Sequence, residues 1–141
     1  MKTLKGISIR QPWADMIIKG EKTMELRKSL PPDGIPDYLL IHSPLKLDYT
    51  FSSFYGYESP WQLTTGKFLA IAKTNGIMKI TEKNHLKYLQ QHKQPIPFYG
   101  EQYGIFLTIV KILDRPIKHK GKIVLFEIPQ EIRDKIEKYL T

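Results

Sequence analysis

The sequence predicts an α+β fold, a small, partly closed β-barrel flanked by short α-helices. Several short runs have the alternating or fully apolar pattern of β-strands, whereas three short segments have the period of an amphipathic helix. Strands and helices follow one another in mixed order, without internal repeats, low-complexity tracts or an obvious linker. Because 141 residues suit one domain of ordinary size, we expect a single domain over residues 1–141.

Composition narrows the classes of protein before any motif is considered. Apolar residues make up 41% of the chain and charged residues 26%, which is the balance of a globular domain. The absence of cysteine excludes disulfides, thiolate zinc sites and a cysteine nucleophile. The longest apolar runs fall far short of the roughly 20 residues of a transmembrane helix, and the start lacks an apolar leader. We therefore expect a cytoplasmic protein without a membrane partner.

A strand followed by a short helix is expected near the start of the chain. Residues 6–10 are short and β-branched, which favours a strand. Pro12 suits the first turn of a helix, because its missing N–H is not needed there. Trp13 and Ile17 then share one apolar helical face, and Gly20 can take the left-handed conformation that ends a helix.

A second strand is expected where the apolar period changes to two. Met24 and Leu26 point one way, whereas Thr23, Glu25 and Arg27 point the other. One face of this strand is therefore apolar and the other carries charge.

The middle of the chain combines a clear strand with a segment that has no clean period. Residues 31–36 have the turn chemistry of a loop, and residues 38–42 form a fully apolar strand that leads into Ser43. The next segment, residues 45–65, is expected to be either an irregular lid or a short helix followed by a loop. This aromatic-rich insertion contains Tyr49, Phe51, Phe54, Tyr55, Tyr57 and Trp61.

The pattern continues with a long β segment and a helix. Residues 68–80 predict one long strand or a hairpin, because Asn75 and Gly76 could form a two-residue turn or a bulge. Residues 81–91 are expected to form a helix with Leu86 as a core contact.

Two β-rich runs and a helix complete the chain. Residues 103–113 and 122–128 are expected to form strands around a turn at residues 116–121. Ile132 and Ile136 mark a C-terminal amphipathic helix.

The formal charge of +8 favours polyanionic partners, because cations neutralise phosphates and release counterions. Between residues 111 and 122 the only opposing charge is Asp114, among the cations Lys111, Arg115, Lys118, Lys120 and Lys122. These cations belong either to a solvated hairpin or to a rim that faces phosphate.

The densest charge cluster lies at residues 20–27, between the first helix and the second strand. Lys22 falls where the helix gives way to the strand, and Glu25 and Arg27 share one strand face. A carboxylate beside a guanidinium would be held ionised and oriented. The cluster could close the barrel mouth as a structural ion pair, or present a hydrogen-bonding edge to a base with Lys22 near a phosphate. A third option is catalysis, with Lys22 as a base and Glu25 as an acid or base.

Two motifs give this cluster a family resemblance. The first is Ser-Ile-Arg-Gln-Pro-Trp-Ala over residues 8–14, and the second is Gly-x-Lys-x-x-Glu-x-Arg over residues 20–27. Together they resemble the signature of the ASCH domain (activating-signal-cointegrator homology), a member of the PUA-like superfamily. The resemblance continues through the strand that ends at Ser43, residues 66–72 and residues 115–121. It covers most of the chain and is weaker over the aromatic insertion and the last helix.

The resemblance implies a PUA-like β-barrel with a ligand cleft and, as its partner, RNA or a nucleotide. Cations would hold phosphate, a carboxylate would read amino groups and an aromatic ring would stack on the base. The motifs place the candidate ligand contacts at six positions: Lys22, Glu25, Arg27, Arg10, Trp13 and Ser43. The stacking ring is expected to be Trp13, Tyr55, Tyr57 or Trp61.

The same resemblance leaves two other functions open. Some small proteins of this type are amidohydrolases that act on an acylated cytidine, and others are proposed ribonucleases. In the amidohydrolases a Lys at the position of Lys22 works with a Thr at the position of Glu25, so this chain departs from their pattern. If the protein is a hydrolase of a modified nucleoside or RNA, Lys22 and Glu25 are the candidate catalytic residues. The remaining alternative is a protein-interaction module that docks through residues 45–65.

No metal site and no cofactor are expected. The four histidines lack a His-x-x-x-His pair or a nearby acidic triad, and no glycine-rich phosphate loop stands out. His42 alone has a suggestive position, because it ends an apolar strand that could open on the cleft.

Overall fold

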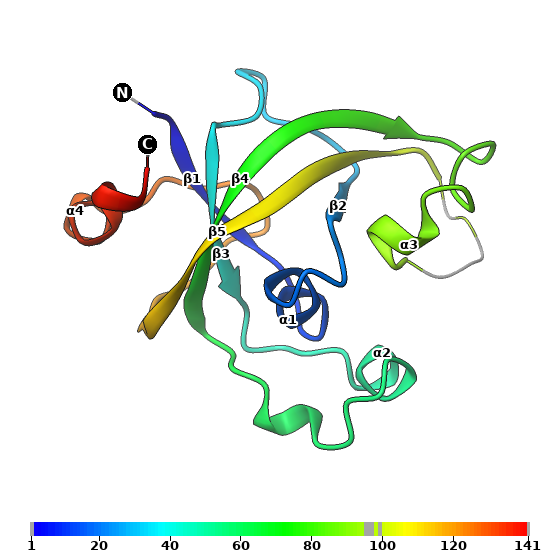
Figure 1. The fold of residues 1–141 in the computed structure, drawn as a ribbon, viewed down its shortest axis with the longest axis horizontal. Coiled ribbons are helices and arrows are strands. Elements are labelled where there is room, and N and C mark those ends of the chain that lie inside the picture. Colours follow the sequence, from blue (N-terminus) through cyan, green and yellow to red (C-terminus); the bar gives the residue numbers. More distant parts are fainter. Residues whose placement is uncertain (1, 95–97, 99, 141) are drawn as a thin grey trace.

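A computed structural model describes residues 2–94, 98 and 100–140, and it contains one curled five-stranded sheet with short helices around it (Figure 1). The strand order is β1-β3-β4-β5-β2. β1 pairs with β3 in parallel, and the other neighbours are antiparallel. The strands are β1 (Leu4–Ser8), β2 (Met24–Arg27), β3 (Tyr38–Ser43), β4 (Lys67–Ile80) and β5 (Gln102–Lys118). The edge strands β1 and β2 do not pair with each other within the described residues, so the sheet is a half-barrel. With the short helices around it, this sheet confirms the predicted α+β fold.

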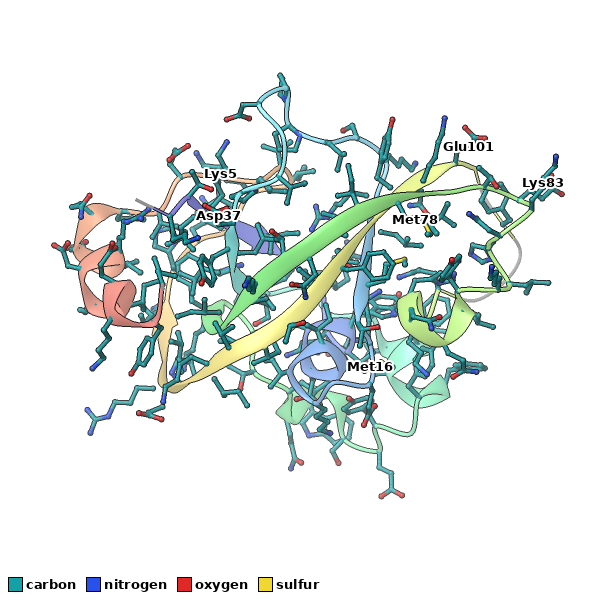
Figure 2. All side chains as sticks on the ribbon, turned by 45° about the horizontal axis from the view of Figure 1, so that its top comes forward. Lys5, Met16, Asp37, Met78, Lys83 and Glu101 are labelled. Carbon is teal, nitrogen blue, oxygen red and sulfur yellow. The ribbon has the colours of Figure 1, made fainter. Side chains whose placement is uncertain are left out.

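Short helices cover the curled sheet on several sides. They are α1 (Trp13–Ile18), α2 (Tyr49–Phe54), α3 (Leu89–His92) and α4 (Gln130–Ile136). Figure 1 shows α3 and α4 on opposite sides of the molecule, with α1 below the middle of the long β4–β5 pair. Figure 2 places Lys5 and Asp37 on the α4 side, and Lys83 and Glu101 on the α3 side. No helix among the described residues is long and apolar enough to cross a membrane.

β3 organises the core, because every residue of this strand is buried. Leu39 and Ile41 pack in the cluster that includes Ile17 of α1. Tyr38 and Leu40 point the other way, into the cluster that includes Ile132 of α4. Helices α1 and α4 therefore pack against opposite faces of β3, which explains why the strand is apolar on both faces.

One of the two long β segments agrees with the sequence prediction and the other differs from it. β4 is one long strand, the first of the two predicted alternatives, and its pairing with β5 shifts between Thr74 and Ile77, around Gly76 at φ +103°. β5 extends to Lys118, into the turn expected over residues 116–121, and Pro116 is not among its residues paired with β4. A proline is tolerated there because no ladder hydrogen bond needs its N–H. The run expected over residues 122–128 forms only an isolated bridge to β1.

The helix expected over residues 81–91 is confined to α3. The side chain of Asn84 accepts a hydrogen bond from the N–H of Thr81 and donates one to the carbonyl of Lys79. These local bonds give the backbone an alternative to a helix. Leu86, expected in the core, is 63% exposed as a result.

Candidate functional site

Lys22, in the segment after α1, forms a chain of charges with Glu25 and Arg27 of β2. Nζ of Lys22 lies 3.5 Å from Oε1 of Glu25, and Nε of Arg27 lies 3.3 Å from Oε2 of the same carboxylate. The three side chains are 0%, 10% and 19% exposed, respectively. The geometry follows from the sequence, because Gly20 (φ +81°) ends the helix and the two-residue period of β2 places Glu25 beside Arg27.

Lys22 lies behind Glu25 rather than in open space. Its ammonium group donates a hydrogen bond of 2.5 Å to the carbonyl oxygen of His92, at the end of α3. Burial lowers the pKa of Lys22, and the neighbouring Glu25 opposes that shift. In this arrangement Lys22 touches Glu25 and the end of α3, and it lines none of the pockets described below.

Arg27 joins elements across the open side of the half-barrel. Its Nη2 donates to the carbonyl of Ser8 at 2.6 Å, and its Nη1 donates to the carbonyl of Ile123 at 3.0 Å. One guanidinium therefore links β2 to the end of β1 and to the segment after β5. Loss of Arg27 would disturb this link as well as any ligand contact.

Glu25 faces a small pocket of about 180 Å³, which we call the Glu25 pocket. Its walls are Ser8, Ile9, Arg10, Trp13, Glu25, Leu26, Gln94 and Gln102. Nε1 of Trp13 is buried and has no hydrogen-bond partner in the described part of the chain. The indole ring packs against Phe51 of α2, with ring centres 5.2 Å apart. The residues that line the pocket thus include a carboxylate, two amides and an indole ring.

A larger groove of about 740 Å³ lies next to this pocket, and we call it the basic groove. Its cationic walls are Arg10, Arg27, Lys118, Lys120 and Lys122. None of the described residues that line it is acidic. The Lys118–Lys122 part of the basic run therefore faces a concave surface, whereas Lys111 pairs with Asp114 and lies over the ring of Tyr139.

The Glu25 pocket and the basic groove are adjacent. Ser8 and Arg10 line both of them. A ligand in the pocket would therefore lie beside a surface of positive potential. This juxtaposition depends on the end of β1, which lies between the two.

His42 lines the basic groove, and contacts at both ring nitrogens fix its orientation. Its Nε2 lies 2.6 Å from the carbonyl oxygen of His119, and its Nδ1 lies 3.2 Å from the hydroxyl of Ser8. A neutral ring with its proton on Nε2 satisfies both contacts, since Nδ1 can then accept from the hydroxyl. Burial lowers the pKa of His42, which favours that neutral form.

His92 holds a wall of the Glu25 pocket in a similar way. Its Nε2 lies 2.8 Å from the carbonyl oxygen of His85, and its Nδ1 accepts from the N–H of Gln94 at 2.9 Å. Burial lowers the pKa of His92, and the nearby Lys22 adds to the effect. The buried neutral ring fixes the backbone of Gln94, one of the pocket residues that the sequence did not indicate.

Acidification is expected to destabilise the fold through these two histidines. Both have folded pKa values below the ordinary 6.5, so between those values and about pH 6.5 the unfolded chain binds more protons. The free energy of unfolding should be at its full value above about pH 6.5 and fall as the pH drops toward the folded pKa. Urea unfolding at about pH 7.5 and about pH 5.5 measures this. A His92→Gln variant should show a smaller pH dependence, and equal stability at both pH values would contradict the prediction.

The other predicted positions lie outside these two surfaces. The hydroxyl of Ser43 donates to the carbonyl of Thr64, and Ser43 is fully buried. The hydroxyls of Tyr55 and Tyr57 are bonded to the carbonyl of Lys93 and the carboxylate of Asp15. Trp61 is exposed and, like these tyrosines, lines neither the pocket nor the groove. Of the four candidate rings, only Trp13 lies in the wall of the pocket.

Metal ligands do not gather in the part of the chain that the structure describes. No group of three or more His, Asp or Glu side chains there could hold an ion. His85 and His92 stack with ring centres 4.5 Å apart, without a carboxylate to complete a site.

Comparisons with known proteins agree on one family. A family model described as the ASCH domain matches residues 7–117. The ASCH protein of Zymomonas mobilis is 14% identical in its solved structure, with 99% of this chain and 96% of that chain covered at a TM-score of 0.68. One point mutant of the same protein is 14% identical, with 99% of this chain and 98% of that chain covered at a TM-score of 0.68. A second point mutant is 13% identical, with 99% of this chain and 100% of that chain covered at a TM-score of 0.69. No curated protein sequence matches the chain.

Proposed function

The chain belongs to the ASCH domain family, a PUA-like fold family often linked to RNA binding, and on that premise we propose that it binds RNA or a nucleotide in its cleft. The base enters the Glu25 pocket, and the phosphates lie in the basic groove. The observation that carries this proposal is that the two surfaces adjoin and share Ser8 and Arg10 as wall residues. A nucleotide has the same division into a planar hydrogen-bonding part and an anionic part.

The Glu25 pocket suits a single base in size and chemistry. At about 180 Å³ it is smaller than the roughly 300–1,000 Å³ of sites for drug-sized ligands. The carboxylate of Glu25 accepts hydrogen bonds from amino or imino groups, and the amides of Gln94 and Gln102 can donate or accept. The indole of Trp13 supplies an aromatic wall for the base. Lys22 and Arg27 act on the ligand through Glu25, whose two oxygens they hold.

The basic groove supplies affinity that does not depend on the base sequence of the RNA. Its exposed lysines can follow a flexible phosphate backbone without fixed geometry. Arg10, which lines both surfaces, is placed to hold the phosphate of the nucleotide whose base is in the pocket.

Changing Lys120→Gln or Lys122→Gln is expected to weaken binding of single-stranded RNA and to reduce its salt dependence. Each lysine that neutralises one phosphate contributes about 0.7 to the slope of log K against log salt for a single strand. Fluorescence anisotropy with labelled RNA at several salt concentrations measures the slope. Lys135→Gln, an exposed cation on α4, is the matched control and should leave the slope unchanged. An unaltered slope in both groove variants would contradict the proposal.

A further inference from the structure

A third hollow adjoins the two surfaces already described, on the open side of the half-barrel. This seam cleft has a volume of about 710 Å³ and lies between β2 and the segment after β5. Its apolar walls include Leu26, Leu30, Pro31, Pro32, Ile123 and Val124. It shares Glu25 and Gln102 with the Glu25 pocket, and Arg27 and Ile123 with the basic groove. The three hollows therefore meet around the Glu25–Arg27 ion pair.

Ile123 and Val124 form a ridge beside this cleft that the fold itself does not bury. Their side chains are 91% and 67% exposed, although they lie next to Lys122 in a strongly basic region. Two neighbouring large aliphatic side chains at such exposure leave apolar surface for a ligand to cover. The backbone beneath them is fixed, because the carbonyl of Ile123 accepts a hydrogen bond from Arg27. The ridge is thus positioned by the same guanidinium that contacts Glu25.

We propose that the ridge of Ile123 and Val124 binds the base of a nucleotide next to the one in the Glu25 pocket, so that the ligand is a single-stranded RNA segment rather than a free nucleotide. This inference rests on the proposed function and specifies its ligand. An apolar ridge beside a row of cations matches a nucleotide, which has a flat base next to an anionic phosphate. The charge argues for RNA over an apolar peptide, because Ile123 of the ridge also lines the basic groove, whose walls carry five cations.

The size of the three hollows supports a ligand of more than one nucleotide. The Glu25 pocket holds one base, whereas the basic groove and the seam cleft are each about four times larger. The basic groove and the seam cleft share Arg27 and Ile123 as wall residues, so a sugar-phosphate chain in the groove would run beside the ridge. A base on the ridge would remove water from the faces of Ile123 and Val124, which adds affinity without adding charge contacts.

The experiment compares short RNAs with mononucleotides on one double variant. Six-nucleotide homopolymers of each base and the four nucleoside monophosphates are titrated into wild-type protein and into Ile123→Ser/Val124→Ser. Both side chains are exposed, so the fold should tolerate the change. Leu86→Ser, an exposed leucine outside the three hollows, is the matched control.

The double variant is expected to bind the preferred hexanucleotide roughly tenfold more weakly, with an unchanged salt slope, because one base contact is lost and no cation is removed. Affinity for the matching monophosphate should stay within about twofold of wild type, and Leu86→Ser should alter neither affinity. Unchanged hexanucleotide affinity in the double variant would overturn this inference and leave the proposed function standing. If the wild-type protein binds neither class of ligand, both the inference and the proposed function are overturned.

Discussion

Replacing Glu25 with alanine is expected to lower the free energy of unfolding by about 3–5 kcal/mol. The reason is the buried ammonium group of Lys22, which would lose its counterion and either stay charged without a partner or give up its proton. Burial already lowers the pKa of Lys22, and Glu25 supplies the largest opposing influence. Breaking one partner of a buried pair costs far more than the pair contributes to stability, because the remaining charge stays desolvated. Urea unfolding followed by tryptophan fluorescence measures the loss.

A double variant separates the structural role of this pair from its role in binding. Lys22→Met/Glu25→Leu removes both charges and is expected to recover most of the lost stability. Recovery should be incomplete, because the carbonyl of His92 loses the hydrogen bond from Lys22. RNA binding should be lost in Glu25→Ala and in this double variant alike, since the carboxylate that lines the pocket is absent from both. A double variant as unstable as Glu25→Ala, or one that regains RNA binding, would contradict this account.

An exposed ion pair provides the matched control for the size of the effect. Nζ of Lys79 lies 3.1 Å from Oε1 of Glu101, a shorter distance than in the Lys22–Glu25 pair, but both side chains are more than half exposed. Glu101→Ala is therefore expected to change stability little, because water screens the charges. Burial rather than distance decides the cost of losing a partner.

The charge chain could be predicted from sequence because its geometry is local. Gly20 ends α1 in a left-handed conformation, and the two-residue period of β2 then sets Glu25 and Arg27 on one face. The apolar pattern of β3 similarly predicts a strand covered on both faces. These features depend on neighbours within a few residues.

The partners of the same charges could not be predicted, because they come from distant segments. Lys22 donates to the carbonyl of His92, and Arg27 to the carbonyls of Ser8 and Ile123. Side-chain patterns do not show which backbone carbonyl will face a buried cation. The spacing therefore suggested Lys22 as a phosphate contact, whereas the tertiary fold buries it behind Glu25. The lysines that line the basic groove are the exposed Lys118, Lys120 and Lys122.

Local polar chemistry and long-range packing account for the other differences. Asn84 satisfies backbone groups around residues 79–81 and so limits the expected helix to α3. Gln94 and Gln102 line the Glu25 pocket, yet their surroundings in sequence are ordinary loop and strand. Only the meeting of α3, β5 and the end of β1 makes them part of a site.

Gly121→Ala is expected to weaken RNA binding strongly and to destabilise the fold by about 1–3 kcal/mol. A Cβ atom at residue 121 would meet the hydroxyl of Ser8 and lie 2.5 Å from Nδ1 of His42. The hydroxyl of Ser8 can rotate away, but the ring of His42 is buried and held at both nitrogens. The segment that carries Lys120 and Lys122 must therefore move outward. That movement widens the basic groove and separates its cations from the phosphates.

Salt-dependent RNA binding and urea unfolding, measured on the same preparation, test this expectation. Gly104→Ala is the matched control, because its new Cβ atom would crowd the thioether of Met24 at a distance from the groove. A thioether is flexible, so this variant should lose some stability and keep the wild-type salt slope. Gly121→Ala should instead lower the slope along with the affinity, since fewer cations reach the RNA. A wild-type slope in Gly121→Ala would mean that the groove does not depend on the close approach of residue 121 to His42.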